Sequence, residues 1–433
     1  MPSTRIVIVG GGFAGYYAAK TLEKIADPAV EVVLINTTDY FLYLPLLPEV
    51  AAGVLEPRRV CVSLPKQLPR TRLELGTVDV IDLPGRRVSW LGPEGDRGEI
   101  GYDQLILAAG SVNRLLPIPG IAENAHGFRS LSEALYLRDH ITRQLELAAA
   151  TDDQQERDER CTFVVVGAGY TGTEVAAQGQ LFTARLAKQL PALASQRMRW
   201  MILDTAKRVL PELDQRLSDT ADKVLRQRQV EVRMGQSVEE AMTKSVRLTT
   251  GEEVRTRSLI WCVGVRPDPL VGSVELKTER GRLVVDEYLT VPGHPEVFAA
   301  GDCAAVPDLT RPGQLTGMTA QHAQRQGKRV ARNVIASLGS GGVTRKPYRH
   351  HDLGFVVDLG GATAAANPLN IPLSGVPAKA VTRGYHLLSL PGSRIRTAND
   401  WALNTVLPPQ AVQLGLVRSA AVPLDSDELP ARQ

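Results

Sequence analysis

Residues 6–15 read IVIVGGGFAG, and residues 163–172 read FVVVGAGYTG. Each stretch is a short apolar run that ends in glycines spaced as Gly-x-Gly-x-x-Gly. Residues 16–25 follow the first stretch with a helical pattern, and residues 30–35 form another apolar run. The second stretch is followed in the same order by a helical segment and a strand pattern at 199–203. A strand, a glycine turn, a helix and a strand make a βαβ unit, so the sequence predicts an α/β fold with two Rossmann-like domains.

The three glycines of each motif have separate physical reasons. Gly10 permits a tight turn, Gly12 lets the backbone approach a pyrophosphate, and Gly15 lets helix and strand pack closely. The helix N-terminus then offers N–H groups and a positive dipole end to the phosphates. A glycine-rich turn without a ligand is the alternative, but a preceding strand and a following helix are the context of dinucleotide binding. We therefore expect the cofactor-binding residues to include Gly10, Gly12, Phe13, Ala14 and Gly15 in the first motif and Gly167, Gly169 and Gly172 in the second.

The residue that ends the second strand of each unit indicates how the adenosine ribose is held. Asn36 ends this strand in the first unit and can hydrogen-bond a ribose hydroxyl without carrying a charge. Asp204 has the corresponding place in the second unit, where its carboxylate favours the 2′-hydroxyl of NADH over the 2′-phosphate of NADPH. Lys207 and Arg208 follow closely and could reduce this preference. Two dinucleotide sites in one chain predict hydride transfer from a nicotinamide to a flavin.

Length and composition limit the other classes of protein. A chain of 433 residues with 43% hydrophobic residues has room for two or three folded domains. The formal net charge of +3 argues against nucleic-acid binding, which would need a concentrated basic face. No signal-peptide pattern and no run of about 18 apolar residues occurs in the sequence. We therefore expect a cytoplasmic protein, or one on the cytoplasmic face of the cell membrane.

The cysteines form no metal-binding or redox motif. Only four occur, Cys61, Cys161, Cys262 and Cys303, and no two of them are spaced as CxxC. We therefore expect no metal site. Cys161 begins a predicted strand and Cys303 follows the last glycine turn, so we expect both to be buried packing residues.

Further segments resemble those of the two-dinucleotide-binding flavoproteins. LILAAG at 105–110 resembles the family's ATG turn beside FAD, CVGVRP at 262–267 resembles its TGxRP turn beside the nicotinamide, and VFAAGD at 297–302 resembles its late FAD motif. The resemblance implies FAD in the first Rossmann-like domain and NADH in the second. It also implies that Asp302 hydrogen-bonds the ribityl chain and that Glu174 lies near the nicotinamide. The further cofactor contacts that it implies are Ala109, Gly110, Gly264 and Gly301.

Within this superfamily, the sequence is most similar to the type II NADH dehydrogenases, single-subunit NADH:quinone oxidoreductases that pump no protons. FLYLPLLPEVAAG at 41–53 resembles their FxPLLxEVAxG segment, and AQHAQRQG at 320–327 resembles their AQxAxxQG segment. The resemblance implies that Ala320 lies along the flavin and that Gln321 lines the quinone pocket. It implies an enzyme of the respiratory chain whose substrates are NADH and a quinone, either menaquinone or ubiquinone.

The sequence also departs from this family. Gly317-Met318-Thr319 replaces prolines before the AQ pair, and DLGGATAAAN at 358–367 lacks the basic residue of an IGR-like turn. A soluble NAD(P)H-dependent flavin oxidoreductase with another small-molecule acceptor is therefore the alternative function, and an NADH-sensing protein with slow turnover is a second alternative. Residues 45–48 read PLLP where disulfide reductases of this superfamily carry a cysteine pair, so no redox disulfide is expected.

Two residues are candidates for catalytic roles, and each has a structural alternative. Gln321 could hydrogen-bond a quinone carbonyl, or it could pack on a helix face beside the flavin. Glu174 could orient the nicotinamide, or it could be a carboxylate that favours the first turn of its helix. His322 is next to Gln321 and is expected to be structural.

The motif positions suggest domain boundaries. We expect a discontinuous FAD-binding domain at 1–115 and 290–340 and an NAD(H)-binding domain at 116–289. Residues 341–433 are expected to form a C-terminal domain. Apolar residues recur between Asp400 and Leu424, which suits an amphipathic segment at a membrane surface or a helix packed on the protein or on a second subunit of a homodimer.

Overall fold

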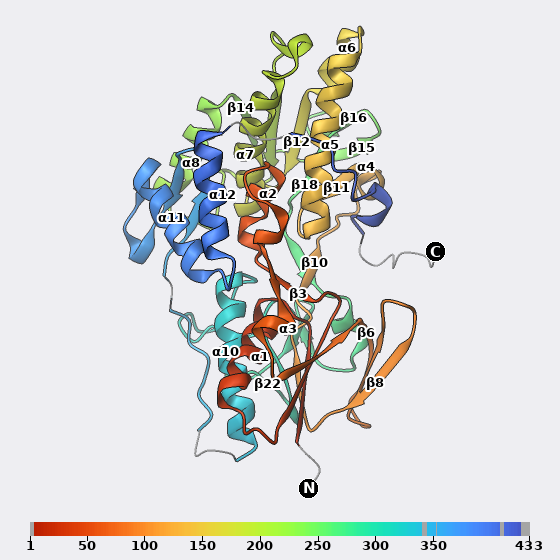
Figure 1. Cartoon of the computed structure of the whole chain (residues 1–433), viewed down its shortest axis with the longest axis vertical. Helices are drawn as coiled ribbons and strands as arrows, with labels where there is room; N and C mark the ends of the chain where they lie inside the picture. The colour runs from red at the N-terminus through yellow and green to blue at the C-terminus, as the bar shows by residue number, and fades with distance from the viewer. Residues whose placement is uncertain (1–3, 340–343, 352, 408–410, 426–433) are drawn as a thin grey trace. The chain divides into compact units, whose positions relative to one another are not determined.

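The computed structural model of the chain describes residues 4–339, 344–351, 353–407 and 411–425 (Figure 1). The chain divides into two compact units. The first comprises Met1–Leu42, Cys61–Val112 and Val265–His351, and the second comprises Tyr43–Val60, Asn113–Gly264 and Asp352–Gln433.

A six-stranded sheet forms the centre of the first unit. Its strand order is β22-β23-β9-β1-β2-β5, in which only β22 runs antiparallel to its neighbour. The middle strands are continuous apolar runs because helices cover the sheet, as is usual for parallel strands. The strands are β1 (Arg5–Val9), β2 (Glu31–Asn36), β5 (Thr71–Leu75), β9 (Gln104–Leu107), β22 (Thr290–Val291) and β23 (His294–Ala299).

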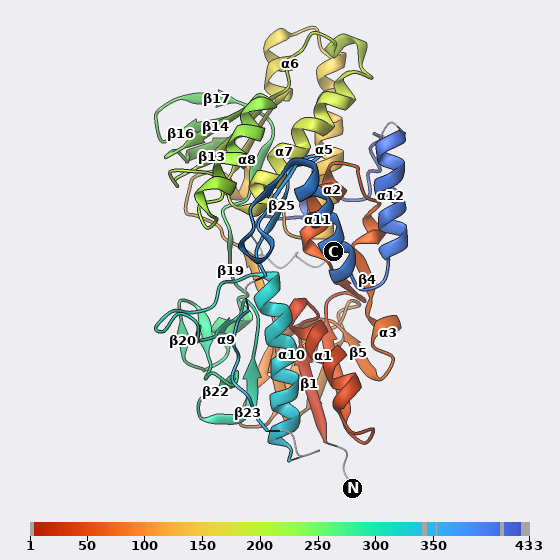
Figure 2. The same cartoon turned by 90° about the vertical axis from the view of Figure 1, so that its left-hand side faces the viewer.

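Two helices of the first unit lie side by side (Figure 2). They are α1 (Phe13–Ile25) and α10 (Ala320–Ser337). Their close approach needs Gly327, since a Cβ there would lie 2.2 Å from the carbonyl oxygen of Ala14. The smaller elements of this unit are β3 (Tyr40–Leu42), β4 (Cys61–Ser63), α3 (Leu64–Gln67), β6 (Thr77–Asp82), β7 (Arg87–Leu91), β8 (Arg97–Gly101), α9 (Leu270–Ser273), β20 (Thr278–Glu279), β21 (Arg282–Val284) and β24 (Ala304–Ala305).

A parallel five-stranded sheet forms the centre of the second unit. Its order is β11-β18-β12-β13-β14, and every neighbouring pair is parallel. The strands are β11 (Ala125–Gly127), β12 (Thr162–Val166), β13 (Arg199–Asp204), β14 (Val230–Met234) and β18 (Leu259–Trp261). Its helices include α2 (Leu47–Ala51), α4 (Ile121–Asn124), α5 (Leu131–Ala150), α6 (Gln154–Arg160), α7 (Tyr170–Ala187) and α8 (Gln215–Gln227), and β15 (Val238–Met242), β16 (Ser245–Leu248) and β17 (Glu253–Arg255) form a separate antiparallel sheet.

Local sequence explains how these helices begin and pack. Ser130 and Glu133 form a capping box at the start of α5, in which each side chain accepts a backbone N–H of the other residue. On α7, Gly179 leaves room for the indole of Trp200, because a Cβ at Gly179 would lie 2.2 Å from that ring. Trp200 stacks on Phe163 with ring centroids 4.7 Å apart, which joins β12 and β13 inside the core.

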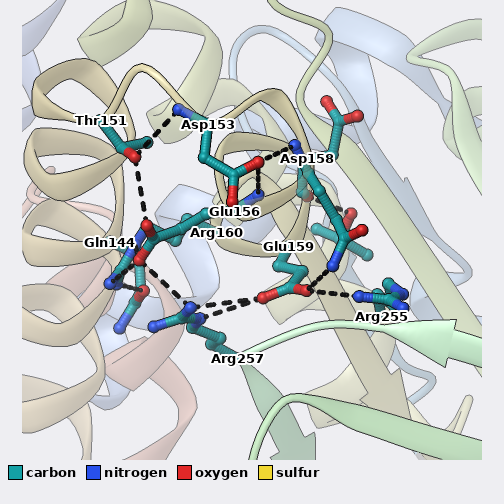
Figure 3. A network of polar contacts seen from close by, with 11 residues as sticks. Gln144, Thr151, Asp153, Glu156, Asp158, Glu159, Arg160, Arg255 and Arg257 are labelled. Atoms are coloured by element: carbon teal, nitrogen blue, oxygen red, sulfur yellow. Dashed lines mark hydrogen bonds and ion pairs between the residues drawn. The ribbon is translucent and has the colours of Figure 1, made fainter.

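An ionic network holds α6 in the second unit (Figure 3). Glu159 is buried and accepts hydrogen bonds from Arg255 Nη1 at 3.0 Å and from Arg257 Nη2 at 3.3 Å. Burial raises the pKa of Glu159, but the hydrogen bonds outweigh burial and hold this pKa below its ordinary value. Arg257 also pairs with Glu156 at 3.1 Å. The charged segment around α6 is therefore fixed to Arg255 of β17 and to Arg257, which follows this strand.

The last part of the chain completes the second unit. A small antiparallel sheet of β25 (Val356–Asp358), β26 (Ala364–Ala366) and β27 (Leu373–Ser374) is followed by α11 (Gly375–Ser389) and α12 (Arg394–Val406). Asp139 of α5 accepts the backbone N–H groups of Leu414 at 3.2 Å and Gly415 at 2.8 Å. Leu424 is only 2% exposed and belongs to the hydrophobic core around β12 and β18. The described tail is therefore not one continuous helix.

The compact units differ from the expected domain ranges in several places. Residues 43–60 belong to the second unit, because α2 packs on α5 and α7. Residues 265–289 belong to the first unit, where β21 pairs with β24. The described residues after 352 are part of the second unit rather than a third one. Among the described helices, none combines the length and the apolar character that a membrane span requires.

Candidate functional site

The glycine turn of the first unit is tightly constrained at two of its three positions. Gly10 has φ +94°, and a Cβ there would lie 2.4 Å from the carbonyl oxygen of Ala108 and 3.2 Å from the Cα of Ala109. A Cβ at Gly15 would lie 1.8 Å from the carbonyl oxygen of Gly10. Gly12 differs, because a Cβ there would meet nothing within 4 Å. Gly10 and Gly15 are therefore required by the protein itself, whereas Gly12 faces open space at the start of α1.

The second unit repeats this geometry. Gly167 has φ +103°, and its Cβ would lie 2.2 Å from the carbonyl oxygen of Cys262. The Cβ of Gly172 would lie 1.8 Å from the carbonyl oxygen of Gly167, and the Cβ of Gly169 would meet nothing within 4 Å. Gly264, with φ +92°, also faces open space.

Both turns end in a helix N-terminus without a side-chain cap. Gly12 and Gly169 are the N-cap residues of α1 and α7, and neither helix has an acidic residue in its first turn. The first N–H groups of such a helix and its dipole favour an anion. Phe13 and Ala14 supply the first residues of α1. Each turn therefore fits a dinucleotide pyrophosphate, and the fit rests on an open middle glycine at an uncapped helix end.

Asn36 and Asp204 have a supporting role that the sequence did not reveal. Asn36 Oδ1 accepts the backbone N–H of Gly11 at 2.7 Å, and its Nδ2 donates to the carbonyl oxygen of Thr38 at 2.8 Å. Asp204 Oδ2 accepts the N–H of Ala168 at 2.6 Å, and its Oδ1 accepts the N–H of Ala206 at 2.8 Å. Each side chain thus fixes the middle of its glycine turn, in addition to any ribose contact.

The VFAAGD motif at 297–302 lies beside the first glycine turn within the same unit. A Cβ at Gly301, whose φ is +82°, would lie 3.0 Å from the Cβ of Ala14. Gly301 N–H donates to Gln326 Oε1 of α10 at 2.7 Å. The Ser111 hydroxyl donates to Asp302 Oδ2 at 2.6 Å. Gly110 precedes Ser111 and has φ +79°, so the expected FAD residues of distant segments meet in one place.

The structure orients Gln321 at the start of α10. Arg325 Nη1 donates to Gln321 Oε1 at 3.2 Å and to His350 Nδ1 at 3.3 Å. Because a guanidinium can only donate, Gln321 turns its oxygen toward Arg325 and its Nε2 the other way. His322 is buried and pairs with the hydroxyl of Tyr348 at 2.9 Å. Ala320, the first residue of α10, precedes this network.

Glu174 belongs to a cluster of charged residues in the second unit. Its Oε1 accepts the backbone N–H of Asp358 at 2.7 Å. Lys379 Nζ lies 2.6 and 2.5 Å from the two oxygens of Asp358 and 3.8 Å from Glu49 Oε1. Trp401 Nε1–H donates to Glu49 Oε2. Sequence reasoning found Glu174 alone, although a glutamate inside the apolar run LLPEVAA was a signal for Glu49.

The environment of this cluster favours protonated carboxyls. Burial raises the pKa of Glu49 to about 8, and the charge of Asp358 adds to this effect. Burial is also the main cause that raises the pKa of Glu174 well above its ordinary value. Lys379 pairs with Asp358, and the raised pKa of Glu49 leaves it mostly neutral near pH 7.

The two open glycines give a direct test of ligand binding. Alanine adopts φ −72° readily, so Gly169→Ala should leave the melting temperature within about 2 °C of the original value. Its methyl group would occupy the space of a pyrophosphate, so the Kd for NADH should rise at least about tenfold, or about 1.4 kcal/mol. Calorimetry measures the melting temperature and the Kd for NADH. Bound-flavin absorbance measures the FAD content, which should not change.

Gly172→Ala is the matched variant with a structural effect. Its Cβ would clash with the carbonyl oxygen of Gly167, so the melting temperature should fall. Normal NADH binding by Gly169→Ala would show that the second turn does not hold the pyrophosphate.

Glu49→Gln tests the buried carboxyl cluster. Between pH 4.5, the ordinary pKa, and about pH 8, Glu49 keeps its proton in the folded chain but loses it in the unfolded chain. The original protein therefore loses stability as pH rises through this window. The glutamine variant lacks this titration and can still accept the Trp401 N–H. Between about pH 5 and pH 9, the free energy of unfolding of the variant should therefore gain about 2 kcal/mol or more relative to the original. A difference that is constant with pH in denaturant titrations would contradict a raised pKa.

Comparison with known proteins agrees with this geometry. The sequence pattern of the pyridine nucleotide-disulphide oxidoreductase family matches residues 4–327. The chain is 34% identical to the type II NADH:quinone oxidoreductase NdhA of Mycobacterium tuberculosis, over 91% of this chain and 85% of that protein. It is 33% identical to the type II NADH:quinone oxidoreductase Ndh of the same organism, over 96% of this chain and 91% of that protein.

A solved structure has the same fold. The structure of NDH2 from Plasmodium falciparum in complex with NADH superposes with a TM-score of 0.86, covering 95% of this chain and all of that chain, at 17% identity. The predicted α/β class with two dinucleotide-binding folds is thereby confirmed. The chain belongs to the pyridine nucleotide-disulphide oxidoreductase family, and within it to the type II NADH:quinone oxidoreductases.

Proposed function

We propose that this protein is a single-subunit NADH dehydrogenase that carries FAD and passes electrons from NADH to a quinone. The observation that carries this proposal is the pair of glycine turns, each with an open middle glycine at an uncapped helix end. The overall reaction consumes NADH, a quinone and one proton, and it yields NAD⁺ and a quinol. Menaquinone and ubiquinone both fit this balance.

FAD fits the first unit. The residues that would hold it are Gly10, Gly12 and Gly15 at the pyrophosphate and Asp302 at the ribityl chain, where Ser111 already fixes one carboxylate oxygen. The chemistry that a bound flavin supplies is two-electron transfer between NADH and the quinone. The protein's own contribution is to hold the cofactor on rigid turns and to keep Gly301 close to α1.

NADH fits the second unit. Gly167, Gly169 and Gly172 would hold its pyrophosphate, and Asp204 would favour its free 2′-hydroxyl over a 2′-phosphate. Glu174 lies on α7, the helix that starts at this turn, and burial raises its pKa well above the ordinary value. The side chain of Glu174 would orient a nicotinamide amide by hydrogen bonds, and the raised pKa favours its uncharged form.

Gln321 is proposed to contact the quinone. Arg325 holds its oxygen, so its Nε2 is the end that can donate to a quinone carbonyl. A donor at this oxygen stabilises the negative charge that develops there during reduction. The geometry supports this direction of the amide, and the family resemblance of the AQHAQRQG segment supports its location.

Peripheral attachment to the cytoplasmic face of a membrane is part of the proposal. Several apolar side chains on α11 and α12 face solvent in the described chain. They are Leu388, Ile395, Leu403 and Val406, with exposed fractions of 76%, 78%, 56% and 81%. Exposed apolar side chains on these two helices suit a membrane or a second copy of the chain in a homodimer.

Substitutions at Gln321 test the quinone contact. Gln321→Leu removes the donor, so kcat/KM for a short-chain menaquinone analogue should fall at least about tenfold, or about 1.4 kcal/mol. NADH oxidation with ferricyanide, which needs no pocket, should stay within about twofold. Stopped-flow and steady-state absorbance of NADH measure both rates.

Two further variants make this test specific. Gln324→Leu changes the same residue type on the same helix and should keep quinone turnover. Gln321→Glu keeps the pairing with Arg325 but has no N–H donor, so it should lose quinone turnover as Gln321→Leu does. Full quinone activity in Gln321→Leu would remove Gln321 from the proposed site.

A further inference from the structure

The second unit contains a cavity of about 250 Å³ that none of the dinucleotide motifs lines. Its wall is formed by parts of α2, α7, α11 and α12 and by the turn at 360–362. Two arginines line it, Arg185 of α7 and Arg383 of α11. Asn404 and Thr405 of α12 complete the polar part of the wall.

The charges around this cavity do not balance. Lys379 also lines it, but both oxygens of Asp358 lie within 2.6 Å of the Lys379 ammonium and compensate its charge. Glu49 is the carboxyl group in the wall, and its raised pKa of about 8 leaves it mostly neutral near pH 7. Arg185 has no ion-pair partner among the residues that the structure describes. The two arginines therefore leave an excess of positive charge in the wall.

Arg383 is held in place but incompletely bonded. Its guanidinium carbon lies 5.0 Å from the centre of the Trp401 ring, which fixes the side chain by a cation–π contact. Its Nε is enclosed, and it finds no acceptor in the described part of the chain. Arg383 lines the cavity, so the terminal N–H groups of its guanidinium can donate to a ligand oxygen there.

The chemistry of the wall selects the ligand. Arginine binds phosphate oxygens through paired N–H groups, and the side-chain amide of Asn404 can donate a further hydrogen bond. The neighbours of Asn404 and Thr405 on α12, Leu403 and Val406, are 56% and 81% exposed. A ligand here would meet basic groups inside the cavity and an apolar surface next to it.

We propose that this cavity binds the phosphate headgroup of an anionic phospholipid, with the acyl chains directed along the exposed apolar residues of α12. The site would give the protein a preference for anionic membranes. This inference rests on the membrane contact of the proposed function, but it does not depend on electron transfer. A free phosphate ion offers the same oxygens without the apolar part, so the test separates the two sources.

Vesicle flotation of the FAD-loaded protein tests this site. The probes are vesicles of phosphatidylcholine alone and of phosphatidylcholine mixed with phosphatidylglycerol. The original protein should prefer the mixed vesicles. Arg383→Gln should weaken binding to them at least about tenfold more than Arg396→Gln, which removes one exposed charge from α12 outside the cavity. The excess loss should persist at high salt, because salt screens exposed charges more than enclosed ones.

A charge-conserving variant separates the cavity from general attraction. Arg383→Lys keeps the positive charge and lacks the paired N–H groups of the guanidinium, so its binding should also fall, whereas a purely electrostatic effect would leave it normal. Melting temperature and FAD content show that each variant is folded. Phosphate titration of the original protein, followed by its melting temperature, measures binding of the free ion.

Three results would overturn the lipid site. One is an equal loss of vesicle binding in Arg383→Gln and Arg396→Gln. Another is that the original protein has no preference for anionic vesicles and does not bind phosphate. The third is that it has no such preference but binds free phosphate saturably. Oxidation of NADH by a water-soluble quinone, measured without vesicles, should be unchanged in Arg383→Gln. Loss of quinone activity in the original protein together with Arg383-dependent vesicle binding would contradict the proposed function and leave this inference intact.

Discussion

The close approach between each glycine turn and the end of the neighbouring strand is the constraint on which both units depend. A side chain at Gly10 or Gly167 would lie 2.4 or 2.2 Å from a carbonyl oxygen of that strand. The turn is thereby fixed against the sheet, and the helix that follows starts with uncapped N–H groups. Asn36 at the end of β2 and Asp204 at the end of β13 accept backbone N–H groups of the same two turns. A rigid anion site follows from packing, before any cofactor is considered.

Burial of carboxyl groups is the second constraint, and it acts within the second unit. A buried carboxylate is costly unless it is paired or protonated. The Lys379 ammonium lies 2.5 Å from Asp358 and 3.8 Å from Glu49, so it compensates Asp358 most directly. Burial raises the pKa values of Glu49 and Glu174. This cluster joins α2, α7, β25 and α11, which explains why residues 43–60 and the described C-terminal residues fold with the second sheet. The same packing leaves the arginine-lined cavity beside Trp401.

The sequence was sufficient for the features that depend on local chain geometry. Glycine spacing between a strand and a helix predicted both turns and the parallel strands around them, because such turns tolerate few other residues. The resemblance of further segments indicated the family. The sequence could not reveal Glu49, Lys379 or Arg383, whose roles come from contacts between segments hundreds of residues apart. It also could not predict the path of the chain after α12. Asp139 fixes Leu414 and Gly415 in a non-helical path, which no periodic pattern encodes.

The central claim is that electrons pass from NADH to a quinone in this one chain. Anaerobic mixing of the purified flavoprotein with NADH, followed by a short-chain menaquinone analogue, tests it most directly. We expect NADH to bleach the flavin absorbance, the quinone to restore it, and NADH oxidation to continue only while quinone remains. Bleaching without recovery would place the physiological acceptor elsewhere. No bleaching by NADH would contradict the account itself.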